Sequence, residues 1–550
     1  MLTLQLQTKQ IYSAFTVISV NRLFRTALAA ALLLSGATES GLASSRKDKD
    51  IELQIGVVQR FGRKPKDTLT LQAPTGDRLT LRFQTNGKLQ TVMGSSAKFD
   101  LMMQPLPEPK IEEHVVLSTH RSFESAEDSA NRWRARGIPV EIAQPDRWQV
   151  WAKRDVYSMP LLRRLLLQSL QSEGIQTAFI DTQVLQQQPR ATVVVNGYRY
   201  VRDRVEISSG RGVIQVSQPG SDPSRLLYAG SLRLQPNAYG TYTLVNQVPI
   251  ETYLRGVVPH EIGTFAAQSV LEVQAILART YALRNLRRFS IDDYQLCADT
   301  QCQVYQGLTG AAPTTDRAIA TTKGLVLTYQ NELVDAVYSS STGGVTAPFN
   351  DVWYGPERPY LKAVVDSVGS SWDLSRKSLA DEKNFRSFIS QKKGFNEEKE
   401  EWFRWKFQSR LEDLNHELKD YLVSQKSPLA GFRGIQQMQV TKRSLAGRVL
   451  ELTITTDQGT VKLQKDDVRK VFEEPASTLF YLEPVYDSKR VLKGYSFVGG
   501  GLGHGVGLSQ TGSYHLGKLG WSSDRILRFY YPGTQLQPIN DSIVFWHDQN

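Results

Sequence analysis

Apolar and polar residues alternate along residues 51–109, where IELQIGVVQRF, DTLTLQAP and DRLTLRFQT are separated by turn residues. Alternation with a period of two is typical of half-buried strands, so residues 46–109 are predicted to form a small antiparallel β region. Strands of the same kind resume at residue 190 and recur at 436–472. The pattern therefore predicts an α+β chain that is rich in strands.

In residues 110–185, short segments with the strand period of two alternate with segments of helical spacing. The predicted elements are a strand at 114–120, a helix at 122–137, strands at 139–144 and 147–153, a helix at 159–174 and a strand at 176–181. This β-α-β-β-α-β order resembles the SPOR domain, which implies a module that binds peptide-free peptidoglycan strands. A ferredoxin-like structural module without a ligand has the same order, so both interpretations stay open.

The stretch VVPHEIGTFAAQSVLEVQAILARTYALRNL at residues 257–286 predicts a strand-like run, a loop and a helix. Ser269 and Glu272 fit a capping box, which places the start of the helix near residue 270. Glu261 then lies on the loop, just after Pro259. Apolar neighbours on such a loop remove water from the carboxyl group, which raises its pKa and lets it act as an acid. From spacing alone, a surface charge is the simpler interpretation of one Glu.

Two further segments have distinct patterns. In the charge-dense segment 373–424, helical spacing predicts an amphipathic helix that carries Phe403, Phe407, Leu411, Leu414 and Leu418. Ten glycines fall between residues 494 and 520, which indicates unusual backbone angles or a close approach. No frame across 499–512 gives G-x-G-x-x-G, so a dinucleotide-binding loop is excluded.

The charge balance narrows the partners only a little. The chain has 66 Lys and Arg against 55 Asp and Glu, a formal net charge of +11. This charge favours polyanions, anionic membrane surfaces or acidic wall polymers. The basic residues are scattered and form no long run, and no nucleic-acid partner is expected.

The first 45 residues predict export. Arg22 and Arg25 precede the apolar stretch TALAAALLLSGA and the small residues SGLASS, which is the pattern of a signal peptide cut after Ala43 or of an uncleaved N-terminal anchor. No later stretch reaches the roughly 20 apolar residues of a spanning helix. We expect a location in the periplasm or cell envelope, with membrane contact only through this segment.

The chain has two cysteines, Cys297 and Cys302. In an exported protein such a pair predicts either a local disulfide or half of a metal site. Two thiolates do not complete a tetrahedral zinc shell, so further ligands would come from distant parts of the chain. The residues alone leave both interpretations open.

Seven motifs follow one another over about residues 190–540: VNQVPIETYLRGVVPHE, LEVQAILARTYAL, CQVYQG, SSSTGG, PYLKAV, GHGVGLSQTG and YYPGT. Together they resemble the SpoIID/LytB family of peptidoglycan-acting proteins. The resemblance implies a strand-rich catalytic domain at 190–550, with a catalytic-loop helix, a Gly-rich groove and a helical insertion at about 373–424.

The resemblance also implies an activity. It points to a lytic transglycosylase that cleaves the bond between N-acetylmuramic acid and N-acetylglucosamine in peptide-free glycan strands and leaves 1,6-anhydro ends, with Glu261 as the single acid and base. LytB-type relatives imply the alternative, a non-catalytic wall-binding enhancer of an N-acetylmuramoyl-L-alanine amidase.

The motifs further assign residues to the substrate groove, and the loop of Cys297 and Cys302 matches one that binds zinc in some relatives. The predicted substrate contacts are Arg279, Gln303, Tyr305, Ser340, Ser341, Gly343, Gly344, Tyr360, His504 and Gln510. The chain departs from the family pattern at His260, where Ser is usual, and at Leu502 and Thr511, where aromatic residues are usual.

Overall fold

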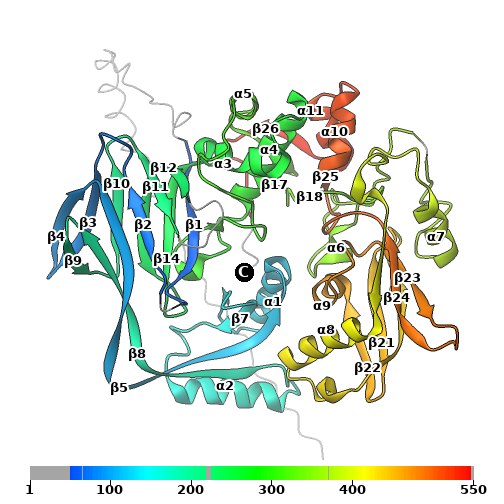
Figure 1. The fold of residues 1–550 in the computed structure, drawn as a ribbon, viewed down its shortest axis with the longest axis horizontal. Helices are drawn as coiled ribbons and strands as arrows, with labels where there is room; N and C mark the ends of the chain where they lie inside the picture. The colour runs from blue at the N-terminus through cyan, green and yellow to red at the C-terminus, as the bar shows by residue number, and fades with distance from the viewer. Residues whose placement is uncertain (1–49, 65, 219–224, 370, 547–550) are drawn as a thin grey trace, which may run out of the picture. The chain divides into compact units, whose positions relative to one another are not determined.

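The computed structural model describes residues 50–64, 66–218, 225–369 and 371–546 (Figure 1). The predicted export signal or anchor at residues 1–45 lies outside these ranges. Within them, no helix combines the length and the apolar character that crossing a membrane requires.

A seven-stranded sheet joins strands from before residue 110 and after residue 190, in the order β15-β1-β14-β13-β10-β3-β4. The pairs β1 with β14 and β3 with β10 are antiparallel. The predicted small β region is therefore part of the same sheet as the later strands. The strands are β1 (Glu52–Phe61), β3 (Leu79–Thr85), β4 (Lys88–Gly94), β10 (Val205–Ser209), β13 (Ser231–Pro236), β14 (Tyr242–Pro249) and β15 (Leu296–Cys297).

An eight-stranded sheet contains the predicted β-α-β-β-α-β module. Within this module the strand order is β8-β5-β7-β6 and every pair is antiparallel. The predicted order of elements is confirmed, and it suits a SPOR-like and a ferredoxin-like module equally. The elements are β2 (Leu69–Gln72), β5 (Ser96–His120), α1 (Phe123–Ala135), β6 (Val140–Ala143), β7 (Trp148–Ala152), α2 (Pro160–Ser172), β8 (Phe179–Val195), β9 (Tyr198–Val201), β11 (Val213–Ser217) and β12 (Arg225–Ala229).

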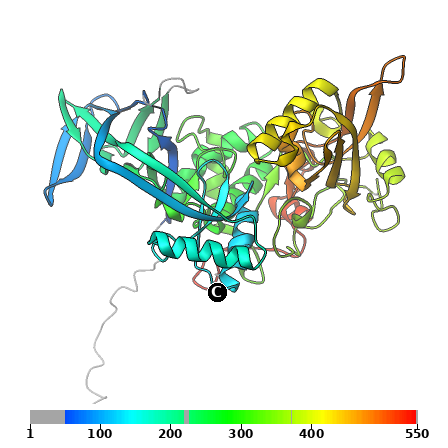
Figure 2. The same ribbon diagram turned by 90° about the horizontal axis from the view of Figure 1, so that it is seen from below.

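Two long strands connect the module to the rest of the sheet (Figures 1 and 2). The strands β5 and β8 pair from Lys98 opposite Val194 to Val116 opposite Phe179, with an irregularity between Pro105 and Lys110. At its start β5 also pairs with β2. The module is thus an insertion between strands of one β body, and its backbone continues that body without a linker.

The predicted strand before Glu261 is wrong, because residues 250–262 form the helix α3 (Ile250–Ile262). Its apolar residues Ile250, Tyr253, Leu254, Val257 and Val258 recur at helical spacing and are all buried. This periodicity outweighs the β preference of the two valines. The helix ends where the Gly263 N–H donates to the Pro259 carbonyl, with the glycine at φ 72°.

The capping box is also wrong. The helix α4 (Gln268–Arg284) begins after Ala267 and has no side-chain cap, so Ser269 already lies inside its first turn. The Glu272 carboxyl group instead accepts a hydrogen bond from Thr321 Oγ1 at 3.3 Å. The helix is buried on all sides of its central turns, so packing rather than capping determines where it begins.

Segment 373–424 is helical only in part. Phe403 lies in a 3₁₀ turn (Glu401–Phe403) and Phe407 lies in the strand β19 (Trp405–Arg410), contrary to the predicted continuous helix. The helix α8 (Leu411–Ser424) begins at Leu411 and buries Leu414 and Leu418 as predicted. The aromatic residues before it belong to strand and turn packing.

Some of the remaining elements, among them α5, β16, α10 and α11, pack against α4, and others form separate cores. The strand β18 pairs in parallel with β25, which brings residues 338–339 beside residues 508–509. Their bounds, with those of the other elements, are α5 (Pro313–Thr321), β16 (Leu325–Tyr329), β17 (Glu332–Leu333), β18 (Tyr338–Ser339), α6 (Phe349–Val352), α7 (Glu382–Ser390), β20 (Ile435–Arg443), β21 (Val449–Thr456), β22 (Gly459–Gln464), α9 (Val468–Val471), β23 (Phe480–Tyr486), β24 (Leu492–Gly499), β25 (Leu508–Ser509), α10 (Gln510–Lys518), α11 (Ser523–Tyr530) and β26 (Gln535–Pro538).

Candidate functional site

Glu261 lies in the last turn of α3 and lines a cavity of about 550 Å³. Segments that are distant in the sequence enclose this cavity. They are the segment from β18 onward, the Gly-rich segment, the loop of Cys302, the start of α1 and the helix α9. Of the predicted substrate contacts, Ser340, His504 and Gln510 line the same cavity as Glu261.

Burial raises the pKa of the Glu261 carboxyl group above its ordinary value of 4.5. A hydrogen bond and a hydroxyl contact oppose this shift. The Val304 N–H donates to Glu261 Oε1 at 2.7 Å, and the Tyr338 hydroxyl contacts the same carboxyl group. Burial is the largest of these effects, so the group keeps its proton to a higher pH than a solvated Glu does. The ring of the neighbouring His260 forms a hydrogen bond to the Thr309 carbonyl at 2.6 Å.

Glu261 is the one carboxyl group lining this cavity, among the residues described, that is free of an ion pair. The second acidic residue in the lining is Glu124, which accepts a hydrogen bond from Arg288 Nη2 at 3.0 Å. A retaining or inverting glycosidase needs two carboxyl groups in defined roles. The geometry therefore suits chemistry that uses one carboxyl group.

Gln303 lies behind the cavity and is buried. Its Oε1 accepts a hydrogen bond from the Tyr338 hydroxyl at 3.1 Å, and its Nε2 donates to the Ala278 carbonyl at 3.3 Å. These bonds link the loop after Cys302 to α4 and to β18. Gln303 thus holds Tyr338 beside Glu261 rather than lining the cavity itself.

The Gly-rich segment supplies His504 and Gln510. Burial lowers the pKa of His504 to about 4, so the ring is neutral at neutral pH. Its Nδ1 accepts a hydrogen bond from the Val506 N–H at 3.0 Å, which leaves the proton on Nε2. Gln510 Nε2 donates to the main-chain carbonyl of Glu261 at 2.9 Å and so fixes the end of α3.

The predicted close approach of glycines is confirmed. Gly501, Gly503, Gly505 and Gly507 all have positive φ, between 73° and 100°. At Gly507 an added Cβ would lie 2.1 Å from the Val337 carbonyl oxygen. A side chain there would push this segment away from the residues that lead into β18, so glycine is required.

The SSSTGG loop encloses a buried acid that the motifs did not indicate. Glu397 accepts hydrogen bonds from Ser341 Oγ at 3.0 Å, from the Thr342 N–H at 2.7 Å and from the Gly344 N–H at 3.0 Å. Ser509 Oγ donates to it as well. Ser341 and Gly344 therefore donate hydrogen bonds to this buried carboxyl group, which joins the loop to β25.

A second acid, Asp366, lies beside Glu397. Burial and the charge of Glu397 raise the pKa of Asp366 well above its ordinary value. Neither acid has a sequence motif around it that points to a site, and only the fold brings them to this loop. Gly343 packs against Gly500, where an added Cβ would lie 2.6 Å from the Gly500 carbonyl carbon.

Three predicted substrate contacts lie in the core. Arg279 is fully buried and pairs with Glu251 through two hydrogen bonds of 2.8 Å and 2.6 Å. Tyr305 is buried and donates to Asn246 Oδ1 at 2.7 Å. Tyr360 is buried and donates to Asp335 Oδ2 at 3.2 Å. Their place in the motifs is explained by packing and ion pairing in the structure.

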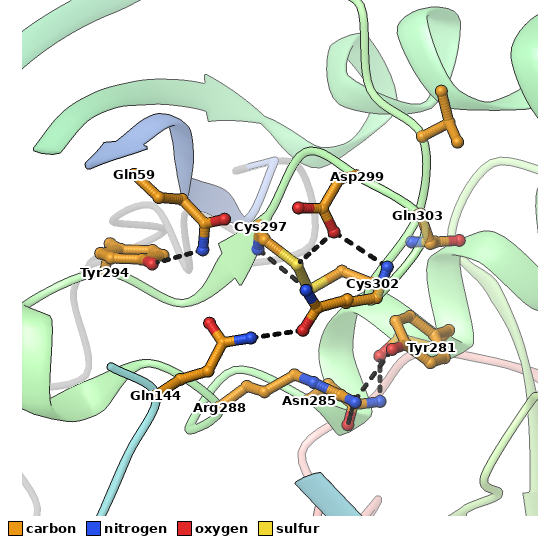
Figure 3. Close-up of a disulfide and its surroundings, with 12 residues drawn as sticks. Gln59, Gln144, Tyr281, Asn285, Arg288, Tyr294, Cys297, Asp299, Cys302 and Gln303 are labelled. Atoms are coloured by element: carbon orange, nitrogen blue, oxygen red, sulfur yellow. Dashed lines mark hydrogen bonds between the residues drawn. A yellow bond between two sulfur atoms is a disulfide. The ribbon is translucent and has the colours of Figure 1, made fainter. Parts of the chain in front are cut away.

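Cys297 and Cys302 form a disulfide, with their Cα atoms 5.6 Å apart (Figure 3). Cys297 is buried beside β1, and Cys302 reaches the lining of the cavity. Asp299 accepts a hydrogen bond from the Gln301 N–H inside the loop at 2.9 Å. Nowhere in the described ranges do three or more His, Cys, Asp or Glu gather as a metal site. Zinc at the reduced cysteines stays a prediction.

Comparison with known proteins finds two matched regions in the chain. Residues 238–329 match the family described as "Stage II sporulation protein", and residues 347–507 match a family described as "Domain of unknown function (DUF8618)". The first match contains Glu261, α4 and both cysteines.

Several curated relatives agree with the first match. The chain is 28% identical to the "Amidase enhancer" of Bacillus subtilis over 52% of its own length and 40% of that protein. It is 26% identical to "Stage II sporulation protein D" of the same organism over 56% of its length and 81% of that protein. An uncharacterized protein of Brachyspira hyodysenteriae is 26% identical over 60% of the chain and 77% of the relative.

The chain thus spans less than half of the enhancer and most of the sporulation protein. The family match covers Glu261 and the part of the cavity lining that lies between residues 238 and 329. The chain carries a domain of the SpoIID/LytB family.

Proposed function

We propose that the chain is an exported peptidoglycan lytic transglycosylase that cleaves peptide-free glycan strands and leaves 1,6-anhydro ends. The observation that supports it best is the state of Glu261. A half-buried carboxyl group with a raised pKa, which forms no ion pair within the described part of the chain, lines a cavity of about 550 Å³. That state suits a general acid.

The proposed reaction uses this one group twice. The Glu261 carboxyl group gives its proton to the glycosidic oxygen as the bond from that oxygen to the anomeric carbon of N-acetylmuramic acid breaks. The 6-hydroxyl oxygen of the same sugar then bonds to the anomeric carbon, and its proton returns to the Glu261 carboxylate. No water is consumed and no second carboxyl group is required.

The neighbours of Glu261 suit supporting roles in this reaction. Gln510 holds the main chain of Glu261, and Gln303 holds Tyr338 beside it. The neutral His504 offers its Nε2 proton to a sugar oxygen. Ser340 completes the lining on the side of β18.

Product analysis with a matched variant tests the proposal. Residues 46–550 and their Glu261→Gln variant are incubated with amidase-stripped strands, and the products are identified by mass spectrometry. Glu412→Gln, at a side chain that is 86% exposed, makes the same chemical change away from the cavity. We expect anhydro ends from the parent and from Glu412→Gln, and a loss of about 10²-fold or more in Glu261→Gln. Equal activity of folded Glu261→Gln would reject the role of Glu261.

The second candidate function is that of a wall-binding enhancer of a cell-wall amidase. The relative named "Amidase enhancer" favours it. In this case the chain yields no glycan products. The parent and Glu261→Gln increase amidase turnover on intact peptidoglycan equally. Measuring amidase rates with both proteins separates the two functions.

The proposed location and the proposed glycan-binding module are compatible with either function. The N-terminal 45 residues deliver the chain to the periplasm or cell envelope, where its partners are glycan strands. The β5-to-β8 module is proposed to hold such strands. Zinc is proposed only for the reduced state of Cys297 and Cys302.

A further inference from the structure

Three cations line the Glu261 cavity from outside the region matched to Stage II sporulation proteins. Arg121 lies between β5 and α1 in the inserted module, and Arg469 and Lys470 lie in α9. We call Arg121, Arg469 and Lys470 the cationic cluster. It belongs to the same cavity as Glu261, so a ligand of that cavity meets both.

The cationic cluster has hydrogen-bond donors that no protein group uses. Arg121 Nε pairs with Asp467 at 2.8 Å, and Arg469 Nη1 pairs with Asp466 at 2.9 Å. Arg121 Nη2 and Arg469 Nε are buried and, among the described residues, have no hydrogen-bond partner. A buried donor without an acceptor is costly, and most such groups in proteins find a partner.

The third cation of the cluster is only weakly held. Lys470 Nζ lies 3.9 Å from Asp466, which is too long for a hydrogen bond. Burial lowers the pKa of Lys470, and the charges of Arg121 and Arg469 lower it further against the opposing effects of Asp466 and Asp467. Lys470 therefore lies close enough to Arg121 and Arg469 to be repelled by both, Asp466 and Asp467 offset part of that repulsion, and a bound anion relieves the rest.

We infer that the cationic cluster is a subsite for the carboxylate of an acidic sugar. This inference rests on the proposed function, in which the sugar is an N-acetylmuramic acid residue whose lactyl carboxylate carries no peptide. Guanidinium groups bind carboxylates through directed, charge-assisted N–H donors. When a peptide is attached, the same carboxyl group is a neutral amide, so the cluster selects peptide-free strands.

The inserted module then has a part in the site itself. Arg121, Ser122 and Glu124 at the start of α1, with Trp148 of β7, line the cavity beside residues of the family domain. The module contributes one wall of the cavity and one cation of the subsite. This role is separate from any glycan binding elsewhere on the module. Selection of strands and the reaction at Glu261 occur in one cavity.

The test measures binding to two forms of one probe. Amidase-stripped strands are used with free lactyl carboxylates and after their conversion to methylamides, at one salt concentration. The parent for binding is full-length Glu261→Gln, which prevents cleavage. We expect it to bind the carboxylate form at least about tenfold more tightly. Equal affinity for the two forms would overturn the inference.

A matched pair of variants separates the subsite from general attraction to a basic protein. Arg469→Gln with Lys470→Gln removes two charges from the cluster. Arg376→Gln with Arg528→Gln removes two charges from side chains that are 85% and 66% exposed. The first pair should abolish the preference for carboxylate strands and the second should keep most of it. Equal losses in both pairs would contradict the subsite.

Two further readouts complete the test. Lys470→Gln alone changes a side chain that is 36% exposed and should lose part of the preference for carboxylate strands. This variant replaces the double variant if the latter does not fold. Cleavage by the parent chain with Glu261 intact is measured on both strand forms. Anhydro products without a preference contradict the subsite alone. A preference without products contradicts the proposed reaction alone.

Discussion

At the scale of single residues, the state of Glu261 follows from its neighbours. The motif indicated an acid, and the apolar residues around it indicated a raised pKa; the structure agrees on the shift and its main cause. The support from Gln510 and the contacts of the buried Glu397 could not be predicted, because they join residues that lie far apart in the sequence.

The raised pKa predicts how stability depends on pH. A carboxyl group whose pKa is higher in the folded state stabilises the fold below its unfolded value, and this contribution is lost as pH rises through the folded value. Glu261→Gln does not titrate, so its free energy of unfolding relative to the parent should rise between pH 4 and pH 8.

Chemical denaturation of both proteins at the two pH values measures this difference. Glu412→Gln, at an exposed side chain, should show no comparable change. A difference between parent and Glu261→Gln that stays constant with pH would mean that burial does not control the Glu261 carboxyl group.

At the scale of elements, the prediction succeeded where the periodicity and the residues at the element ends agreed. The helices of the module were predicted because each has a signal at its start: the Ser122 side chain caps α1, and Pro160 begins α2. The helix α3 was missed because two β-branched residues suggested a strand, whereas the burial of a whole helical stripe decided its structure. The capping box failed because packing of α4 placed its start earlier.

The disulfide gives a prediction at this scale. It closes a loop across five positions, and closing so short a loop stabilises a fold by about 2 kcal/mol in the chain-entropy account. Cys297→Ser with Cys302→Ser should lower the free energy of unfolding by about this amount. Chemical denaturation measures it.

A related experiment tests the alternative that the two cysteines bind zinc. Reduced parent protein and the double serine variant are compared with and without added zinc, and bound zinc is measured by mass spectrometry. Zinc that binds the reduced parent and restores its stability would favour a metal site at the cysteine loop. No binding would leave the disulfide as the state that stabilises this loop.

At the scale of the whole molecule, the module is built into the body. The strands β5 and β8 continue from the shared sheet into the module, and Arg287 and Arg288 after α4 pair with Glu127 and Glu124 of α1. Sequence patterns could not show which distant strands pair, because pairing depends on the packing of the entire sheet. Residues 238–329, the inserted module and residues 347–507 each contribute side chains to the Glu261 cavity.

In the proposed reaction, one carboxyl group cleaves glycan strands without water. The most direct measurement is cleavage of peptide-free strands in water enriched in oxygen-18, followed by mass spectrometry of the new ends. Ring closure by the sugar's own hydroxyl predicts anhydro ends that contain no oxygen-18. Reducing ends that carry one oxygen-18 would show that water attacks, and would contradict the single-carboxylate transglycosylase.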